Sequence, residues 1–251
     1  MTRNIELKSQ NGYMIPCEYD IEEGDRAVCV ICHGFASSKA SSTAHMVSRM
    51  CRSAGVGFLT FDFPCHGESR AVFTGLTPKN CLDDLRTCEL WAREQSKGGE
   101  IIYFGSSFGG YTVLGHLCTR EHEGRLALLR SAAVNMDRVF DPFMEDIKNE
   151  MAEKGYFTYK SGFGPDLRLS PGFFESLKSF SPFDYDLPEG ADVHMIHGAR
   201  DTVVDFGQAL KYSLRKNCPI DIMALSDHSI ADRDGIKRLR ELVSVMLEKV
   251  K

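Results

Sequence analysis

The sequence contains no long apolar run. No segment approaches the roughly 18 consecutive apolar residues of a membrane-spanning helix, so no such helix is expected. The first 20 residues lack the apolar stretch of a secretory signal, which argues against export. Lysine and arginine form no basic run and the formal net charge is −5, so neither nucleic acid nor a membrane surface is an expected partner.

The cysteines give no sign of a disulfide framework or a metal site. Their number, nine, is odd, and without an export signal free thiols in a reducing cytoplasm are the simplest expectation. Cys29 and Cys32 form a C-x-x-C pattern inside an apolar run (27–32) typical of a buried strand. Residues three apart on a strand point to opposite faces, so the pair could not hold one zinc ion. We predict a cytoplasmic protein with two small core residues here.

What the sequence does contain is an alternation of apolar β-rich runs with helical patterns. At 251 residues and 43% hydrophobic, it can bury one substantial core. Asn11-Gly12 lies between two short alternating stretches and predicts an opening hairpin. Strands separated by helices predict an α/β protein with a mostly parallel sheet and helices on both faces. Strands are expected at 27–32, 56–62, 101–105, 126–135, 192–198 and 220–225, and helices at about 41–54, 78–97, 106–120, 205–216 and from 232.

The alternation breaks between residues 136 and 185, where one helical pattern (144–155) stands among irregular sequence. No repeat, linker or low-complexity tract divides the chain, so we predict one domain, 1–251, with a cap insertion at about 136–185. Aromatic side chains gather in this insertion. We expect most of them to build its own small core and a few to line an apolar acyl or aryl pocket. They include Phe140, Phe143, Phe157, Tyr159, Phe163, Phe173 and Phe174.

The segment from Gly105 to Gly110 fits the pattern G-x-S-x-G in one register only, which places Ser107 at its centre. It follows an apolar strand and precedes an amphipathic helix. A strand that turns at once into a helix holds its central residue in a strained conformation with the hydroxyl exposed. Side chains two residues before and two after would collide with the neighbouring chain, so glycine is required there. We therefore predict that Ser107 is a nucleophile.

A serine nucleophile needs a base, and the base must come from the same edge of the sheet. Asp201 and His228 each stand just past the end of a later apolar strand. The chain order Ser, Asp, His is that of the α/β hydrolases. Asp227 is an alternative acid, but it adjoins His228, and neighbours at a strand end seldom point at each other. Asp205 is a second alternative, although we expect it to cap the following helix.

The other histidines have simpler interpretations. His194 and His197 lie on or beside a strand, and His116 and His122 are expected on a helix or at the surface. His33 is expected to organise its loop by hydrogen bonds. That loop also supplies a candidate backbone donor for an oxyanion, the Phe35 N–H, with the Phe108 N–H as the second.

These motifs together resemble the α/β-hydrolase superfamily. They are HGF (33–35), FDFPCHGES (61–69), GSSFGG (105–110), HGARDTVV (197–204) and DHS (227–229), and they span most of the chain. One departure is the Pro-Cys before His66-Gly67, where many members have Arg-Gly. The small size and the insertion after the sixth strand are similar to bacterial cinnamoyl and feruloyl esterases and to monoacylglycerol-lipase-like enzymes. The resemblance implies an α/β-hydrolase fold and a serine esterase.

The expected reaction is acyl transfer from a small-molecule carboxylic ester, possible substrates including aryl and hydroxycinnamoyl esters, with Ser107 as nucleophile and His228 as base. No metal or cofactor is called for. Two alternatives stay open. One is a serine peptidase, aminopeptidase or amidase, and the other is a non-catalytic binding module on a hydrolase scaffold. The sequence does not predict an oligomeric state.

Overall fold

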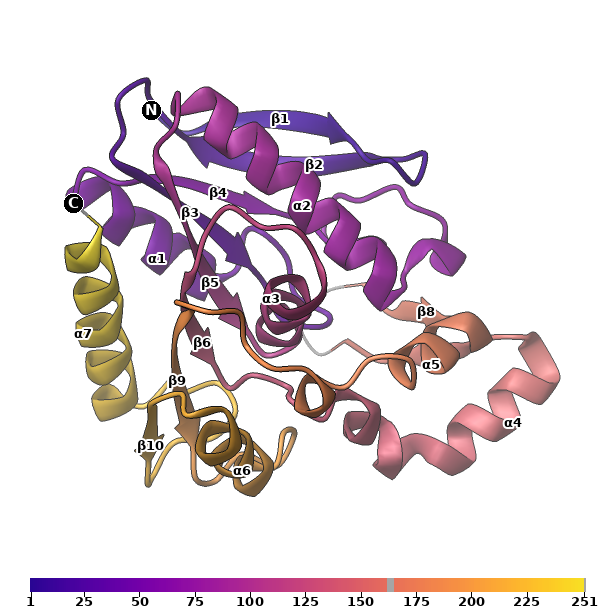
Figure 1. Cartoon of the computed structure of the whole chain (residues 1–251). Helices are drawn as coiled ribbons and strands as arrows, with labels where there is room; N and C mark the ends of the chain where they lie inside the picture. The colour runs from indigo at the N-terminus through magenta and orange to yellow at the C-terminus, as the bar shows by residue number, and fades with distance from the viewer. Residues whose placement is uncertain (162–164, 251) are drawn as a thin grey trace.

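The computed structural model describes residues 1–161 and 165–250, and its centre is an eight-stranded sheet (Figure 1). The strand order is β1-β2-β4-β3-β5-β6-β9-β10. β1 and β2 form an antiparallel hairpin and β2 is antiparallel to β4, whereas the remaining pairs are parallel. The opening hairpin and the mostly parallel sheet are thus confirmed. The strands are β1 (Arg3–Lys8), β2 (Met14–Asp20), β3 (Ala27–Cys32), β4 (Gly57–Phe61), β5 (Glu100–Ser106), β6 (Leu126–Arg130), β9 (Asp192–Gly198) and β10 (Ile220–Met223).

Helices cover both faces of this sheet. Side chains alternate along β3, so Val28, Val30 and Cys32 join one buried cluster while Ala27, Cys29 and Ile31 join the other. Both cysteines are buried free thiols on opposite faces, as predicted. One face is covered by α1 (Ser42–Ser53) and α7 (Arg233–Lys249), and the other by α2 (Pro78–Gln95), α3 (Phe108–Thr119) and α6 (Phe206–Lys216).

Side-chain caps fix where several of these helices begin. Thr77 accepts a hydrogen bond from Asn80 N before the Pro78 turn of α2. Asp205 caps α6 by accepting from Gly207 N at 2.8 Å, which confirms its expected structural role. No helix in the described part of the chain is long and apolar enough to cross a membrane.

Two strands end at least two residues earlier than the sequence predicts. β6 stops at Arg130, not at residue 135, because Ser131 takes a positive φ of 47° and donates its N–H to Ile196 O (2.8 Å). The following residues 132–134 are apolar because they are buried, not because they are extended. β10 stops at Met223, and Leu225 beyond it is exposed. Apolar composition therefore marks burial in a turn at 132–134 and an exposed side chain at Leu225, and in neither place an extended strand.

Residues 136–185 connect β6 to β9. The helix predicted at 144–155 is confirmed as α4 (Met144–Lys154), which ends at Gly155 in a left-handed conformation. A second helix and a small antiparallel hairpin were not predicted, because their short patterns carry little periodicity. Phe163 lies outside the described residues. The remaining elements are η2 (Met136–Phe143), β7 (Phe157–Tyr159), β8 (Leu167–Leu169), α5 (Pro171–Leu177) and η3 (Pro182–Asp184), with η1 (Phe73–Gly75) earlier in the chain.

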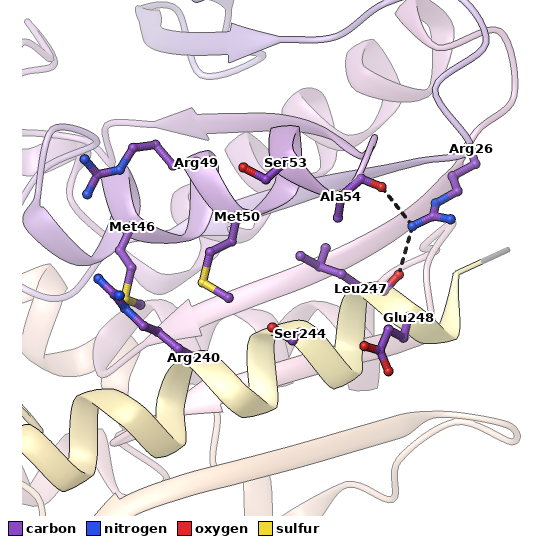
Figure 2. Close-up of a pocket in the computed structure, with 10 residues that line it drawn as sticks. All are labelled: Arg26, Met46, Arg49, Met50, Ser53, Ala54, Arg240, Ser244, Leu247 and Glu248. Carbon is purple, nitrogen blue, oxygen red and sulfur yellow. Dashed lines mark hydrogen bonds between the residues drawn. The ribbon is translucent and has the colours of Figure 1, made fainter.

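A pocket of about 580 Å³ lies between α1 and α7 (Figure 2). Met46 and Met50 of α1 point across it toward α7, Met46 toward Arg240. Arg26, just before β3, donates to Ala54 O (2.9 Å) and Leu247 O (3.4 Å), and so ties the ends of both helices together. None of the lining residues belongs to the strand-end loops that carry Ser107, Asp201 or His228, so this pocket is separate from the site described next.

Candidate active site

Ser107 stands at a sharp turn between β5 and α3. Its backbone has φ 53° and ψ −114°, a conformation that residues other than glycine rarely adopt. Glycine is needed on both sides because the chain doubles back closely. A Cβ on Gly105 would lie 2.8 Å from Gly109 O, and a Cβ on Gly109 would lie 2.1 Å from Cys32 O. The glycine positions predicted from the sequence are therefore the positions at which a side chain would collide with backbone.

Gly109→Ala is expected to destabilise the protein by about 3 kcal/mol or more, because the new methyl group meets immobile backbone of β3. The measurement is the free energy of unfolding in urea. Gly172→Ala in α5 is the matched control, since its Cβ would meet nothing closer than Ser170 Oγ at 3.7 Å. Equal stability of the two variants would contradict the tight turn around Ser107.

Three side chains from separate strand ends meet at this turn. His228 Nε2 lies 3.0 Å from Ser107 Oγ, and His228 Nδ1 lies 2.7 Å from Asp201 Oδ2. Asp201 can only accept, so Nδ1 carries the imidazole proton and Nε2 is left to accept from the serine hydroxyl. The structure thus brings together the three residues predicted from the sequence. The competing Asp227 is exposed and accepts instead from Ser229 N (2.8 Å).

The Asp201 carboxylate is fully buried and has donors on both oxygens. Oδ1 accepts from Val203 N and Val204 N, each at 2.8 Å. Oδ2 faces His228 and also His197, whose Nε2 lies 3.0 Å away. Burial alone would raise the pKa of Asp201, but contacts with His197 and His228 outweigh it and hold the pKa well below its usual range. Asp201 therefore stays ionised opposite the imidazole.

His197 is a member of this group that sequence reasoning missed. The sequence predicts it on or beside a strand, and it does lie in β9, but its buried ring turns toward Asp201 and Val204 O (3.1 Å). The signal was its position four residues before Asp201 in the HGARD segment. His116 lies on a helix, as expected, and within α3 it is fully buried against Glu89.

The loop after β3 approaches Ser107 from the other side. A Cβ on Gly34 would lie 3.4 Å from Ser107 Cβ, so the loop that carries Phe35 runs close to the nucleophile turn. Within the described residues neither the Phe35 N–H nor the Phe108 N–H donates a hydrogen bond. Phe108 is the first residue of α3, where the N–H groups point away from the helix. Both predicted oxyanion donors are therefore unengaged.

His33 holds this loop in the way the sequence predicts. Its Nδ1 contacts Gly34 O at 2.7 Å and its Nε2 accepts from Phe63 N at 3.2 Å, an arrangement that requires the neutral ring. Burial lowers the pKa of His33 to about 4. Burial and the neighbouring His33 lower the pKa of His66, whose ring packs against Phe35, to about 3.

These two histidines make the fold sensitive to acid. Each has a folded-state pKa below the ordinary 6.5, so as pH falls the unfolded chain takes up protons first and stability is lost between pH 6.5 and the folded-state values. His66→Phe should reduce the slope of unfolding free energy against pH, between pH 4 and 6, by about 1.4 kcal/mol per pH unit. Urea titrations at several pH values measure this. His45→Phe, at an exposed position, is the control, and an unchanged slope in His66→Phe would contradict the expectation.

A buried ion pair fixes the loops around the site. Asp62 accepts from Lys39 N (2.7 Å), Lys39 Nζ (3.2 Å) and Glu68 N (2.9 Å), and so joins the loop after β3 to the loop after β4. Pro64-Cys65, where many α/β hydrolases have Arg-Gly, lies in the loop after β4. The Asp62 contacts are made to Lys39 and Glu68 and not to the three side chains at the turn.

Aromatic side chains connect the Phe35 loop to residues 136–185. The Phe35 ring lies 5.3–5.7 Å, centroid to centroid, from Phe108, Phe140, Tyr159 and Phe173. Phe140, Phe157 and Phe173 are buried, whereas Phe143 and Tyr159 line a cleft of about 1010 Å³. Asp201 and Val203 line the same cleft. It therefore lies between the segment and the loop of the candidate acid.

Among residues 1–161 and 165–250, no group of three or more histidine, cysteine, aspartate or glutamate side chains is arranged to hold a metal ion. The chemistry available from the described side chains is that of a hydroxyl, an imidazole and a carboxylate in one hydrogen-bonded line, with backbone N–H groups opposite.

The sheet, its helices and the turn at Ser107 define the chain as an α/β hydrolase. Two solved structures have the same fold throughout: a putative hydrolase from Agrobacterium vitis S4 (TM-score 0.80, 22% identity, 98% of each chain) and Est1E from Butyrivibrio proteoclasticus with ferulic acid bound (TM-score 0.78, 19% identity, 97% of this chain and 98% of the other). More particularly, the chain belongs to the hydrolase family described as serine aminopeptidase, S33, whose profile matches residues 23–160, more than half of its length.

One curated relative carries a more specific description. The mouse protein described as palmitoyl-protein thioesterase ABHD10, mitochondrial, is 23% identical over 224 residues, which covers 86% of this chain and 74% of that protein. The structure of mouse ABHD10 superimposes with a TM-score of 0.78 at 19% identity and covers 99% of this chain and 100% of the other. At this identity the likeness shows the fold, and the prediction of a cytoplasmic location stays a prediction beside a mitochondrial relative.

Proposed function

We propose that the protein is a serine hydrolase that cleaves small-molecule carboxylic esters through an acyl-enzyme. The observation that carries the proposal is the hydrogen-bonded line from Ser107 Oγ through His228 to Asp201, at 3.0 and 2.7 Å. A serine held at φ 53° with its hydroxyl on a neutral imidazole nitrogen is arranged for nucleophilic attack. A non-catalytic binding module would have no use for this arrangement.

In the proposed reaction, Ser107 Oγ attacks the ester carbonyl carbon while His228 Nε2 takes the hydroxyl proton. The Asp201 carboxylate stabilises the imidazolium that forms. The Phe35 and Phe108 N–H groups donate to the oxyanion, each contributing about 3 kcal/mol to transition-state stabilisation. His228 then protonates the leaving alcohol, which departs. Water, deprotonated by His228, attacks the acyl-enzyme and releases the acid and Ser107.

Residues 136–185 are proposed to cap this site and to form part of the substrate pocket, in one domain with the rest of the chain. The support is the cleft of about 1010 Å³, which Phe143 and Tyr159 line from one side and Val203 from the other. Buried Phe140, Phe157 and Phe173 act as the core of the segment. Apolar side chains such as Phe143, Tyr159 and Phe183 lie in this cleft among polar ones, and Asp201 is the member of the hydrogen-bonded line that it reaches. An acyl chain or an aryl group could pack on these aromatic rings, and the aryl and hydroxycinnamoyl esters are proposed on that ground.

A thioester is the second candidate substrate. The relative described as a palmitoyl-protein thioesterase favours it, and an acyl thioester passes through the same acyl-serine. Amide hydrolysis, as in the family's description, is the third candidate. All three share the nucleophile, so the substrate panel and not the fold separates them.

Labelling with a fluorophosphonate probe tests the proposal. We expect a single adduct, located on Ser107 by peptide mass mapping, together with turnover of 4-nitrophenyl butyrate. The panel should then include long-chain acyl esters, hydroxycinnamate esters, an acyl thioester and an aminoacyl 4-nitroanilide. Absence of any adduct would favour the binding module, and a preference for the anilide would favour a peptidase.

A further inference from the structure

Arg130 and Ser131, at the end of β6, contact both the nucleophile turn and the histidine loop. Arg130 O accepts from Ser107 N at 2.8 Å, next to the parallel pairing of Arg130 with Ser106. The Arg130 guanidinium donates to Ser106 Oγ and, through Nη2, to Ser229 O (2.5 Å) and His228 O (3.4 Å). Two adjacent residues thus connect the strand that carries Ser107 with the loop that carries His228.

Ser131 adds a second bond to the same carbonyl. Its buried Oγ donates to His228 O at 2.9 Å, and its N–H donates to Ile196 O of β9 at 2.8 Å. The positive φ of Ser131, 47°, turns the chain out of β6 so that both groups point away from the strand. The backbone of His228 is therefore held from β6, by side chains that do not touch the imidazole.

Within the described residues, the Arg130 guanidinium makes these contacts while buried and without a carboxylate partner. In the described part of the chain it forms no ion pair with a carboxylate, and its Nε is buried without a partner. Burial lowers the pKa of Arg130 to about 10, with Asp201 and Asp227 as the carboxylates near enough to oppose the effect. Burying an unpaired cation costs stability, so a purely structural role is a poor explanation for it.

We propose that Arg130 and Ser131 are positioning residues that hold His228 against Ser107 by fixing the carbonyls of His228 and Ser229. The inference rests on the proposed function, because it assigns no chemistry of its own to either residue. The guanidinium fork suits the task, since its planar donors reach Ser106 on one side and two successive carbonyls on the other.

The test measures kcat and KM for 4-nitrophenyl butyrate in Arg130→Met, Arg130→Lys and Ser131→Ala and compares them with those of the wild-type enzyme. Arg130→Met should lower kcat by about 100-fold with KM changed by less than about 3-fold, because a displaced base weakens the transition state and not substrate binding. The rate of fluorophosphonate labelling of Ser107 should fall in parallel. Arg130→Lys should recover part of the loss, and the double variant Arg130→Met/Ser131→Ala should lose less than the product of the single losses, since both act through one carbonyl.

Arg125→Met is the matched control at the opposite end of β6, where Arg125 donates to Glu189 O. The proposal is overturned if kcat of Arg130→Met and Ser131→Ala stays within about 3-fold of wild type, if Arg125→Met loses as much, or if KM rises while kcat is unchanged. If Arg130→Met fails to fold, the same limits on kcat and KM are applied to Arg130→Lys and Ser131→Ala. If the proposed function is wrong, the wild-type protein itself will not be labelled at Ser107. The proposed function and the positioning role of Arg130 and Ser131 then both fail.

Discussion

Ser107→Ala is expected to lower kcat for 4-nitrophenyl butyrate by about 10⁶-fold, the largest effect of any single substitution in this chain. The methyl group leaves the turn, the imidazole and both N–H donors in place, so only the nucleophile is lost. What activity remains should come from substrate binding and the oxyanion donors. The measurement is the initial rate, with folding checked by circular dichroism.

Ser244→Ala is the matched control, because Ser244 is exposed on α7 and lines the pocket between α1 and α7, which is separate from Ser107. It should keep the wild-type rate. If Ser107→Ala hydrolysed the ester at a comparable rate, the acyl-serine mechanism would be wrong, whatever the hydrogen-bonding geometry at the turn.

Asp201→Asn is expected to lower kcat by about 10⁴-fold with little change in fold. The Asn oxygen can keep the two bonds from Val203 N and Val204 N, which places the NH₂ group where Oδ2 now faces His228. A donor opposite Nδ1 requires the imidazole to accept there and to carry its proton on Nε2. His228 would then present a hydrogen to Ser107 and could not act as its base.

Asp227→Asn is the informative comparison, since Asp227 is the competing acid that adjoins His228 in the sequence. Its contact with Ser229 N is one that an asparagine oxygen can also make, so kcat should fall by less than about 10-fold. A larger loss in Asp227→Asn than in Asp201→Asn would reverse the assignment of the acid. Rates of fluorophosphonate labelling provide an independent measure of both variants.

Periodicity predicted the central sheet because a parallel strand is buried on both faces and its composition shows this directly. The run at 27–32 is an example, with all six residues of β3 buried. The same reasoning failed at 131–135, where apolar residues are buried in a turn beneath α3. It also failed for β7 and β8, three residues each, since pairs this short take their conformation from contacts far away in the sequence.

Position at strand ends predicted the three side chains at the turn, because parallel strands bring their carboxyl ends to one edge of the sheet. Ser107, Asp201 and His228 each follow a strand, and the structure places them within hydrogen-bonding distance. The supporting residues could not be found in this way. Arg130 is an ordinary strand residue in the sequence, and only the packed structure shows that its side chain turns toward the histidine loop. His197 gives one signal, its position four residues before Asp201, but strand periodicity does not show that its ring turns toward the carboxylate.

The position of Phe35 has a consequence for any attempt to redesign this enzyme. Its N–H is a proposed oxyanion donor, while its ring packs against Phe140, Tyr159 and Phe173 of the 136–185 segment. Phe140 and Phe173 are buried, so a smaller residue at either position would remove packing from the Phe35 ring, and we expect the proposed oxyanion donor to move as well. Phe143 lines the cleft, and its ring contacts among the described residues are with Phe157 and Tyr159 and not with Phe35, so we expect substitutions there to change substrate preference with less effect on the rate.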